Sequence, residues 1–299
     1  MNFNKIAFVV LFLLGACAPI KDEVNPAKQN NHQWVELIDA HLSKWDKYLS
    51  FQHQAGYDGT PPKNAQGELI DPIGLNQPNY DVFTTVQDGD DTIIRVTGEY
   101  YGCLVTKEEY KNYHFQLKYK WGNTKWAIRK DKLMDSGILY HSNGPHGAEF
   151  WRSWMLSHEF QIMEGHTGDF WSQASSAIDI RAYKPESVMD PVAHESQDYI
   201  PLFWGGPYGI YCSRSGNYEK PKDEWNTLDL YCFEDKSLHV VNGKVVMILK
   251  NSRYREEDGT NVPMTKGKIQ LQSEAAEIFF KEIKIRKLDS LSQEHERLF

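Results

Sequence analysis

Cysteine is scarce in this chain, and the few cysteines do not form a metal-binding pattern. Four occur among 299 residues, with no CxxC pair and no cluster of cysteine and histidine. A structural zinc site is therefore not expected. Three of the four, Cys103, Cys212 and Cys232, lie beyond the N-terminal segment. Cys212 and Cys232 stand in strand-like segments, so the sequence leaves open either a disulfide between them or buried thiols.

A basic patch is also absent, and no hydrophobic run is long enough to span a bilayer. The formal net charge is -8 at pH 7, so nucleic acid is not expected as a partner. The apolar run of residues 6–14 is too short for a transmembrane helix. It follows Lys5 and is closely followed by Cys17, an arrangement that resembles a bacterial lipoprotein signal.

This resemblance implies a membrane-anchored protein. We expect residues 1–16 to be removed as a signal peptide, Cys17 to carry the lipid, and residues 17–33 to form a tether. The lipid would hold the protein in the cell envelope, at the outer membrane, facing either the periplasm or the exterior. The folded part is expected to be a monomer.

Helical periodicity is rare and is clearest in residues 34–49. Apolar residues recur there at helical spacing, which predicts one short amphipathic helix that packs on the main domain. The segment that follows is rich in Gly, Pro, Asn and Gln, so residues 34–82 are expected to form an N-terminal extension of a helix and a loop.

Residues 83–299 show short alternating segments typical of β-strands, with almost no helical periodicity between them. These segments predict an all-β domain, a jelly-roll sandwich of two curved antiparallel sheets. Asn242-Gly243 predicts a type I′ hairpin turn. A long interruption at residues 183–206 contains Trp204 and is expected to be a functional loop. The expected strands are residues 93–97, 101–105, 113–121, 137–141, 159–163, 177–180, 208–212, 225–233, 237–241, 244–249, 267–272 and 278–287.

One expected strand carries polar side chains on a single face. Residues two apart share a face of a strand, so Glu159 and Gln161 point one way while Phe160 and Ile162 point the other. A Gly-rich turn, residues 165–171, follows at once with a histidine, a carboxylate and two aromatic side chains. This composition is typical of a sugar-binding site.

Eight segments carry a resemblance to a known family, residues 104–110, 115–117, 136–139, 159–162, 224–227, 241–243, 267–272 and 279–285. Together they resemble the 3-keto-disaccharide hydrolase domain. The resemblance implies a concanavalin A-like jelly roll with a cleft on its concave sheet. It also implies cleavage of glycosides whose 3-hydroxyl has been oxidised to a ketone.

A 3-keto sugar needs a base near C2 and a group that polarises the ketone or the enolate. Glu159 is the best candidate base, and His141, Gln161 and His166 are the candidates that would polarise the ketone. If a divalent cation does this instead, His141, Glu159 and His166 offer nitrogen and oxygen ligands. No organic cofactor is expected. The residues expected to contact substrate are Glu164, Asp169, Trp171, Arg181 and Trp204.

Two other functions stay open. Residues 159–164 are similar to the ExDxxE strand of retaining endoglycosidases, although Gln161 replaces the aspartate and Glu164 would reach the cleft only through a β-bulge. Sandwiches of this kind also serve as carbohydrate-binding proteins without catalysis. Arg129 and Lys130 fall between two expected strands, where a solvated charged loop is the simplest interpretation.

Overall fold

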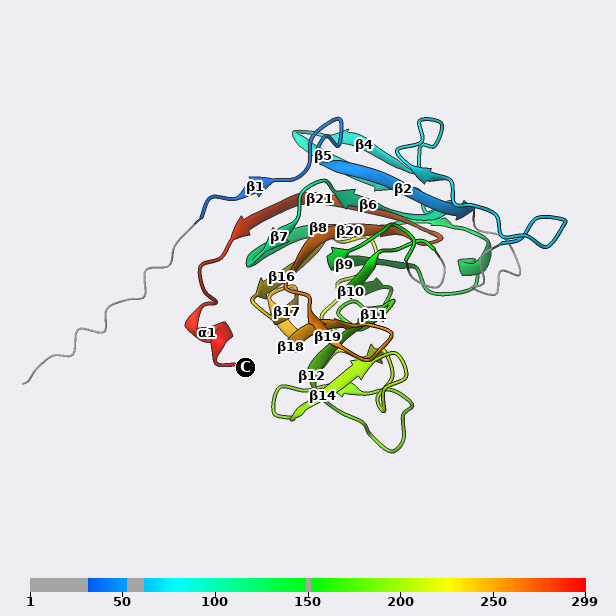
Figure 1. The fold of residues 1–299 in the computed structure, drawn as a ribbon. Helices are drawn as coiled ribbons and strands as arrows, with labels where there is room; N and C mark the ends of the chain where they lie inside the picture. Colours follow the sequence, from blue (N-terminus) through cyan, green and yellow to red (C-terminus); the bar gives the residue numbers. More distant parts are fainter. Residues whose placement is uncertain (1–31, 53–61, 149–151) are drawn as a thin grey trace, which may run out of the picture.

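The computed structural model describes residues 32–52, 62–148 and 152–299 of the chain. The expected signal peptide, the expected lipidation site Cys17 and nearly all of the expected tether lie outside these residues. Within the described residues the strands form two antiparallel sheets, one of twelve strands and one of nine (Figure 1). The prediction of an all-β sandwich of two sheets is confirmed.

The twelve-stranded sheet contains the longest strands of the fold. β8 and β21 pair along most of their length at its centre. In spatial order the sheet consists of β13 (Val192–Ala193), β12 (Ser176–Tyr183), β18 (Lys244–Arg255), β17 (Lys236–Val241), β16 (Asn226–Phe233), β8 (Tyr113–Lys125), β21 (Ala276–Lys287), β5 (Asp91–Val96) and β4 (Phe83–Asp88), with β14 (Tyr199–Phe203), β19 (Asn261–Pro263) and β1 (Val35–Glu36) paired to β12, β18 and β21.

The nine-stranded sheet has β9 and β10 side by side near the middle of the molecule (Figure 1). In spatial order it consists of β15 (Tyr211–Cys212), β11 (Phe170–Gln173), β10 (Leu156–Met163), β9 (Asp135–Asn143), β20 (Lys266–Ser273), β6 (Tyr100–Thr106), β2 (Trp45–Gln52) and β3 (Gly74–Leu75), with β7 (Tyr110–Lys111) paired to β20. Two short helices accompany the strands, the 3₁₀ helix η1 (Ala127–Arg129) and α1 (Gln293–Glu296). Among the described residues, no helix is both long and apolar enough to cross a membrane.

The main core lies between the two sheets and sets the direction of the β10 side chains. Phe160 and Ile162 are fully buried in this core, and Phe160 stacks on His239 of β17 with the ring centroids 4.1 Å apart. Because neighbouring residues of a strand point to opposite faces, Glu159 and Gln161 point away from the core. The outer face of the nine-stranded sheet is therefore the polar one, as the alternation predicted.

The predicted helix of residues 34–49 is wrong. β1 and β2 lie at its ends, joined by a turn in which the Asp39 carboxylate accepts hydrogen bonds from the backbone N–H groups of His41 and Ser43. Leu42 has a positive φ of 52°, which no right-handed helix contains. Leu42 and Trp45 are buried in the core as the spacing implied, but a turn and a strand place them there instead of a helix.

The segment of residues 183–206 is more ordered than a loop. It contains β13 and β14, which both pair with β12. The hairpin prediction is confirmed, since Asn242 and Gly243 have positive φ angles and join β17 to β18. The sequence left a disulfide between Cys212 and Cys232 open, but Cys103, Cys212 and Cys232 are buried thiols that form no disulfide.

Candidate active site

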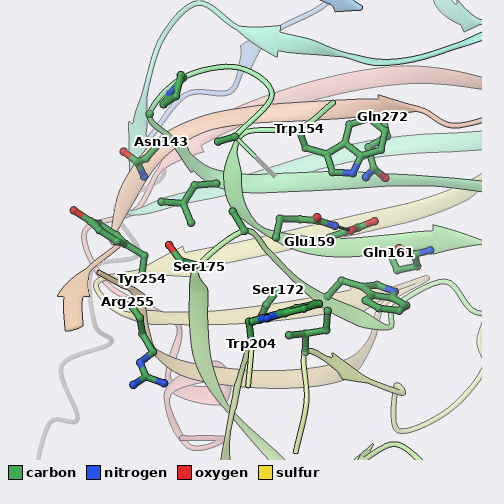
Figure 2. Close-up of a pocket in the computed structure, with 18 of the residues that line it drawn as sticks. Asn143, Trp154, Glu159, Gln161, Ser172, Ser175, Trp204, Tyr254, Arg255 and Gln272 are labelled. Atoms are coloured by element: carbon green, nitrogen blue, oxygen red, sulfur yellow. Dashed lines mark hydrogen bonds between the residues drawn. The ribbon is translucent and has the colours of Figure 1, made fainter. Parts of the chain in front are cut away.

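A pocket of about 1270 Å³ opens on the outer face of the nine-stranded sheet. Glu159 and Gln161 of β10 both line it, and Figure 2 shows Glu159 near the middle of the lining residues. Only 2% of Glu159 and 4% of Gln161 is exposed to solvent. The alternation along β10 thus places a nearly dry carboxyl group and an amide on the floor of one pocket.

Amides from neighbouring strands surround the Glu159 carboxyl group. β11 pairs with β10 on one side, and the Gln173 Nε2 of β11 donates a hydrogen bond to Glu159 Oε2. On the other side, Gln272 of β20 lies across β9 and lines the same pocket. The β9 residue between them is Gly137, which has no side chain to occupy this space.

A second polar group lies at one end of the pocket. Gln161 Nε2 donates to Asp135 Oδ1 at 2.6 Å, and Asp135 forms an ion pair with Arg129. The Arg129 guanidinium also contacts Glu274 Oε1 at 3.0 Å. Arg129 belongs to η1, and 16% of its side chain is exposed. The interpretation of Arg129 as a solvated charge is therefore wrong, because η1 folds it inward between two buried carboxylates.

The pocket raises the pKa of its carboxyl groups. Burial is the largest cause of the pKa of Glu159 standing well above its usual range, and the charges of Glu274 and Asp135 add to it. Hydrogen bonds from Gln173 and Gln272 oppose the rise. Burial also raises the pKa of Asp135 and of Glu274, while Arg129 opposes it in both cases. A raised carboxyl pKa lets Glu159 exchange protons nearer to neutral pH.

Three tryptophans line the pocket. Trp171 of β11 lies directly opposite Glu159 in the strand register. Its ring packs against the ring of Tyr211, with the ring centroids 4.7 Å apart. Trp154 lies on the side of Gln272, and Trp204 lies below Glu159 in the view of Figure 2. Trp204 is 74% exposed. The predicted substrate contacts Trp171 and Trp204 thus lie at the pocket with Glu159 and Gln161.

The turn after β10 is held together by its own ion pairs. The Asp169 side chain is completely buried and accepts hydrogen bonds at 2.9 Å from the Arg214 backbone N–H and from Arg214 Nη1. Tyr211 also donates to Asp169, and His166 Nδ1 lies 3.3 Å from the same carboxylate. Neither Asp169 nor His166 lines the pocket. Their bonds instead fix the turn that leads into β11.

His141 is directed into the core by a β-bulge. The pairing of β9 with β20 shifts register at this point, and His141 has a positive φ of 51°. Tyr140 and His141 consequently both turn inward. The His141 ring packs edge-on against the Tyr113 ring there, with the ring centroids 5.9 Å apart. Burial lowers the pKa of His141 to about 4. The predicted ligands His141, Glu159 and His166 are not brought together, and no cluster of three His, Cys, Asp or Glu suited to a metal occurs among the described residues.

Two further predicted residues lie away from the pocket. β10 keeps its register from His158 to Met163, so no bulge turns Glu164 toward the cleft, and its carboxylate accepts from the Met134 N–H at 3.3 Å. Arg181 belongs to β12 of the other sheet, where its guanidinium donates to the backbone carbonyls of Leu298 and Phe299. Glu164 thus supports a turn, and Arg181 holds the C-terminus.

A comparison with models of protein families shows which family the chain belongs to. The model of the 3-keto-alpha-glucoside-1,2-lyase-like domain matches residues 33–286. The chain belongs to this family. The resemblance found in the sequence is confirmed, and the family shows that the protein is carbohydrate-active. No curated protein is significantly similar to the chain.

Solved structures with similar folds have distant sequences. A candidate glycosyl hydrolase from Parabacteroides distasonis is 19% identical, with 86% of this chain and all of that chain covered and a TM-score of 0.45. The LamAcat protein from Zobellia galactanivorans is 10% identical over 88% of this chain and all of that chain, with a TM-score of 0.42. A beta-glucanase from Bacillus licheniformis is 9% identical over 86% and 98% of the two chains, with a TM-score of 0.37.

Around Glu159, the sequence-based prediction of the site did not include Asp135, Gln173, Gln272 or Glu274, and it treated Arg129 as a solvated charge. A signal existed for Gln272, because Gln270 and Gln272 alternate with apolar residues in a segment that resembles the family. Asp135 stands directly before another such segment. Arg129, Gln173 and Glu274 carry no comparable signal, since η1 and the ends of β11 and β20 bring them to the pocket.

Gly137→Ala is expected to reduce activity more than stability. A Cβ atom at this position would lie 2.6 Å from Glu159 Oε1 and closer still to Gln272 Oε1, so the carboxyl group would have to move. A displacement of this kind costs about 100-fold in kcat, and overpacking costs about 1–3 kcal/mol of stability. Steady-state kinetics and thermal unfolding measure the two effects.

Gly165→Ala provides a matched control for this variant. Gly165 has a positive φ of 77° and nothing within 4 Å of a new Cβ atom. The substitution should therefore cost about 1 kcal/mol through backbone strain alone, with little change in kcat. If the Gly137→Ala variant and the parent protein have equal kcat, Gly137 is not needed to position the Glu159 carboxyl group.

Proposed function

We propose that this protein cleaves 3-keto-glycosides by β-elimination, with Glu159 as the base. The observation that carries the proposal is the position of Glu159, buried on the floor of a pocket, flanked by amides, with a raised pKa. Membership in the 3-keto-alpha-glucoside-1,2-lyase-like family supports the choice of substrate. The expected anchoring as a lipoprotein of the outer membrane stays a prediction from the sequence.

The chemistry follows from the ketone at C3. The ketone acidifies the C2 hydrogen, and ionised Glu159 removes it as a proton. The electron pair of the C2–H bond forms an enolate, and its collapse makes the C1–C2 double bond while the C1–O bond to the aglycone breaks. The departing oxygen takes a proton from water at the mouth of the pocket, and the hydroxide left behind takes the C2 proton back from Glu159, which restores the carboxylate. The products are a 1,2-unsaturated 3-keto sugar and the free aglycone.

The groups beside Glu159 are suited to hold the enolate. Donors that are already oriented stabilise a developing oxyanion without reorganisation. Arg129 and Gln161 line the pocket and are held in place by Asp135, so the C3 oxygen can accept hydrogen bonds from their N–H groups. His141 and His166 do not line the pocket, and we therefore assign this task to Arg129 and Gln161.

The direct test uses a 3-keto-glucoside with a chromogenic aglycone. Release of the aglycone together with near-ultraviolet absorbance from the conjugated enone supports elimination. Release without the enone indicates direct hydrolysis, and the same glucoside with its 3-hydroxyl unoxidised should not react. Binding of the keto sugar with no product would favour the non-catalytic alternative. Retaining hydrolysis is not supported, because Glu164 lies away from the cleft.

The pH dependence gives a second prediction. Activity requires ionised Glu159, whose pKa is raised above its usual range, so kcat/KM should rise with pH through a value above about 4.5. A profile of kcat/KM against pH measures this limb. If activity falls as pH rises through the same region, Glu159 acts as a proton donor and the assignment of the base is wrong.

A further inference from the structure

The pocket differs in character at its two ends along β10. Met163 pairs with Asp135 at one end of the strand, and Leu156 pairs with Asn143 at the other. The end near Asp135 holds both carboxylates of the Arg129 ion pairs. Figure 2 shows the same division, with Gln161 and Gln272 on one side of Glu159 and Asn143, Ser175 and Tyr254 on the other.

The pocket has room for more than one sugar ring. Its volume of about 1270 Å³ exceeds the range of about 300–1,000 Å³ usual for drug-sized ligands. A strand rises about 3.3 Å per residue, so Leu156 lies about 10 Å along β10 from Glu159. When the reacting ring occupies the charged end, which supplies donors for its hydroxyls and ketone, the aglycone extends toward Leu156.

The lining surface of the pocket is mostly apolar, although Asn143, Ser175 and Tyr254 add polar atoms on the Leu156 side. A second sugar would need partners for its hydroxyls, whereas a flat apolar group needs only surface to cover. Trp204 follows Phe203, which pairs with Ala177, so it stands on the Ser175 side of the pocket, where most of the residue is exposed and can stack on a flat group. The apolar and small residues of the pocket lining include Pro145, Ala148, Leu156, Ala174, Trp204 and Ile210.

The charges around the pocket disfavour anions. Among the described residues, its lining contains two guanidinium groups and five carboxyl groups, and Arg129 is already paired with two of the carboxylates. Arg255 lies over the ring of Phe203, with 4.3 Å between the guanidinium carbon and the ring centroid. Glu256 and Glu257 are exposed at the mouth, and neither forms an ion pair within the described residues. Glu256 and Glu257 outnumber Arg255 there, and an excess of one sign of charge repels ligands of that sign.

We propose that the substrates are 3-keto-glycosides of neutral, apolar, preferably aromatic aglycones, bound with the aglycone over Leu156 and against Trp204. This inference rests on the proposed function, because it assigns the aglycone side of the same pocket. It makes two other classes the poorer substrates, glycosides with an anionic aglycone and glycosides whose aglycone is a second sugar.

Trp204→Ala tests the position of the aglycone. For a phenyl 3-keto-glucoside we expect KM to rise about tenfold with little change in kcat. For methyl 3-keto-glucoside, which has no ring to stack, neither constant should change. Trp225→Ala is the control, since Trp225 is half-buried beneath Lys120 and Lys281 and outside the pocket. Equal changes for both substrates, or no change for either, would overturn the proposal.

The charge argument has its own test. The 4-carbamoylphenyl and 4-carboxyphenyl 3-keto-glucosides have similar shape and differ in charge. We expect the neutral substrate to have about tenfold higher kcat/KM at low salt, and the difference to shrink in about 0.5 M salt and in the Glu256→Gln/Glu257→Gln variant. A preference for the carboxylate, or for a disaccharide over the phenyl glycoside, would contradict the proposed class.

Failure of the proposed function can be distinguished from failure of this inference. If the parent protein turns over none of these substrates, the phenyl and carboxyphenyl glucosides are titrated into the Glu159→Gln variant and followed by tryptophan fluorescence. If the neutral compound binds and Trp204→Ala weakens this binding, the aglycone site is supported and only the proposed elimination chemistry is wrong. Absence of such binding would retract the aglycone site.

Discussion

Glu159→Gln is expected to lower kcat/KM for a 3-keto-glucoside by about 10⁴-fold, the upper range for loss of a general base. The glutamine amide keeps the shape of the carboxyl group and its place between Gln173 and Gln272, but it cannot take the C2 proton. Initial rates of aglycone release measure the effect. Glu224→Gln is the matched control, because Glu224 is exposed and does not line the pocket.

The same variant should be more stable than the parent protein at neutral pH. The folded protein raises the pKa of Glu159, so it binds this proton more tightly than the unfolded chain does. The stability associated with this proton is complete below the unfolded pKa of about 4.5 and is lost as pH rises through the folded pKa. The glutamine side chain does not titrate in this range. The Tm of the Glu159→Gln variant should therefore exceed that of the parent protein by a margin that grows with pH.

Calorimetric scans between about pH 4 and pH 8 test this expectation. The Tm values of the parent protein and of Glu159→Gln should be close at the acid end and should separate as pH increases. A variant that loses activity and also loses stability at every pH would indicate that Glu159 supports the fold. Unchanged activity would remove Glu159 from the mechanism.

Arg129→Met is expected to reduce the free energy of unfolding by about 3 kcal/mol near neutral pH. Methionine keeps much of the apolar stem but leaves the carboxylates of Asp135 and Glu274 without their cation in a buried site. Arg129 opposes the rise in the pKa of both groups, so these pKa values should increase further in the variant. Denaturant unfolding followed by tryptophan fluorescence measures the loss.

The pH dependence of this loss identifies its cause. The destabilisation should become smaller in acid, where both carboxyl groups are protonated and need no cation. The triple variant Arg129→Met/Asp135→Asn/Glu274→Gln removes the uncompensated charges and should recover most of the stability. Little destabilisation in the single variant, or a loss that does not depend on pH, would show that the ion pairs do not hold η1 in place.

The strand alternation alone determined the fold class and the centre of the pocket. Apolar residues that alternate with polar ones can be buried only when one face of each strand packs on a second sheet, so a sandwich was the expected result. The same period placed Glu159 and Gln161 on the outer face, because their neighbours Phe160 and Ile162 need the core. Local sequence decides both outcomes, since side chains alternate along any strand that is not interrupted by a bulge.

Departures from ideal strands could not be found in this way. The bulge in β9 reverses the direction of His141, and the positive φ of Leu42 replaces a predicted helix with a turn. Each depends on pairing with a distant segment, β20 in the first case and β6 and the core in the second. A periodic pattern gives no sign of one extra residue or one left-handed position.

Only the tertiary structure decided which charges meet Glu159. Arg129, Asp135 and Glu274 come from η1, β9 and the end of β20, and each looks like an ordinary surface charge in the sequence. Their effect on the pKa of Glu159 depends on burial and on distances between segments far apart in the chain. The sequence by itself determined the face of the sheet on which Glu159 lies, while packing determined the proton affinity of Glu159, because an electric field is the sum of charges that only folding brings together.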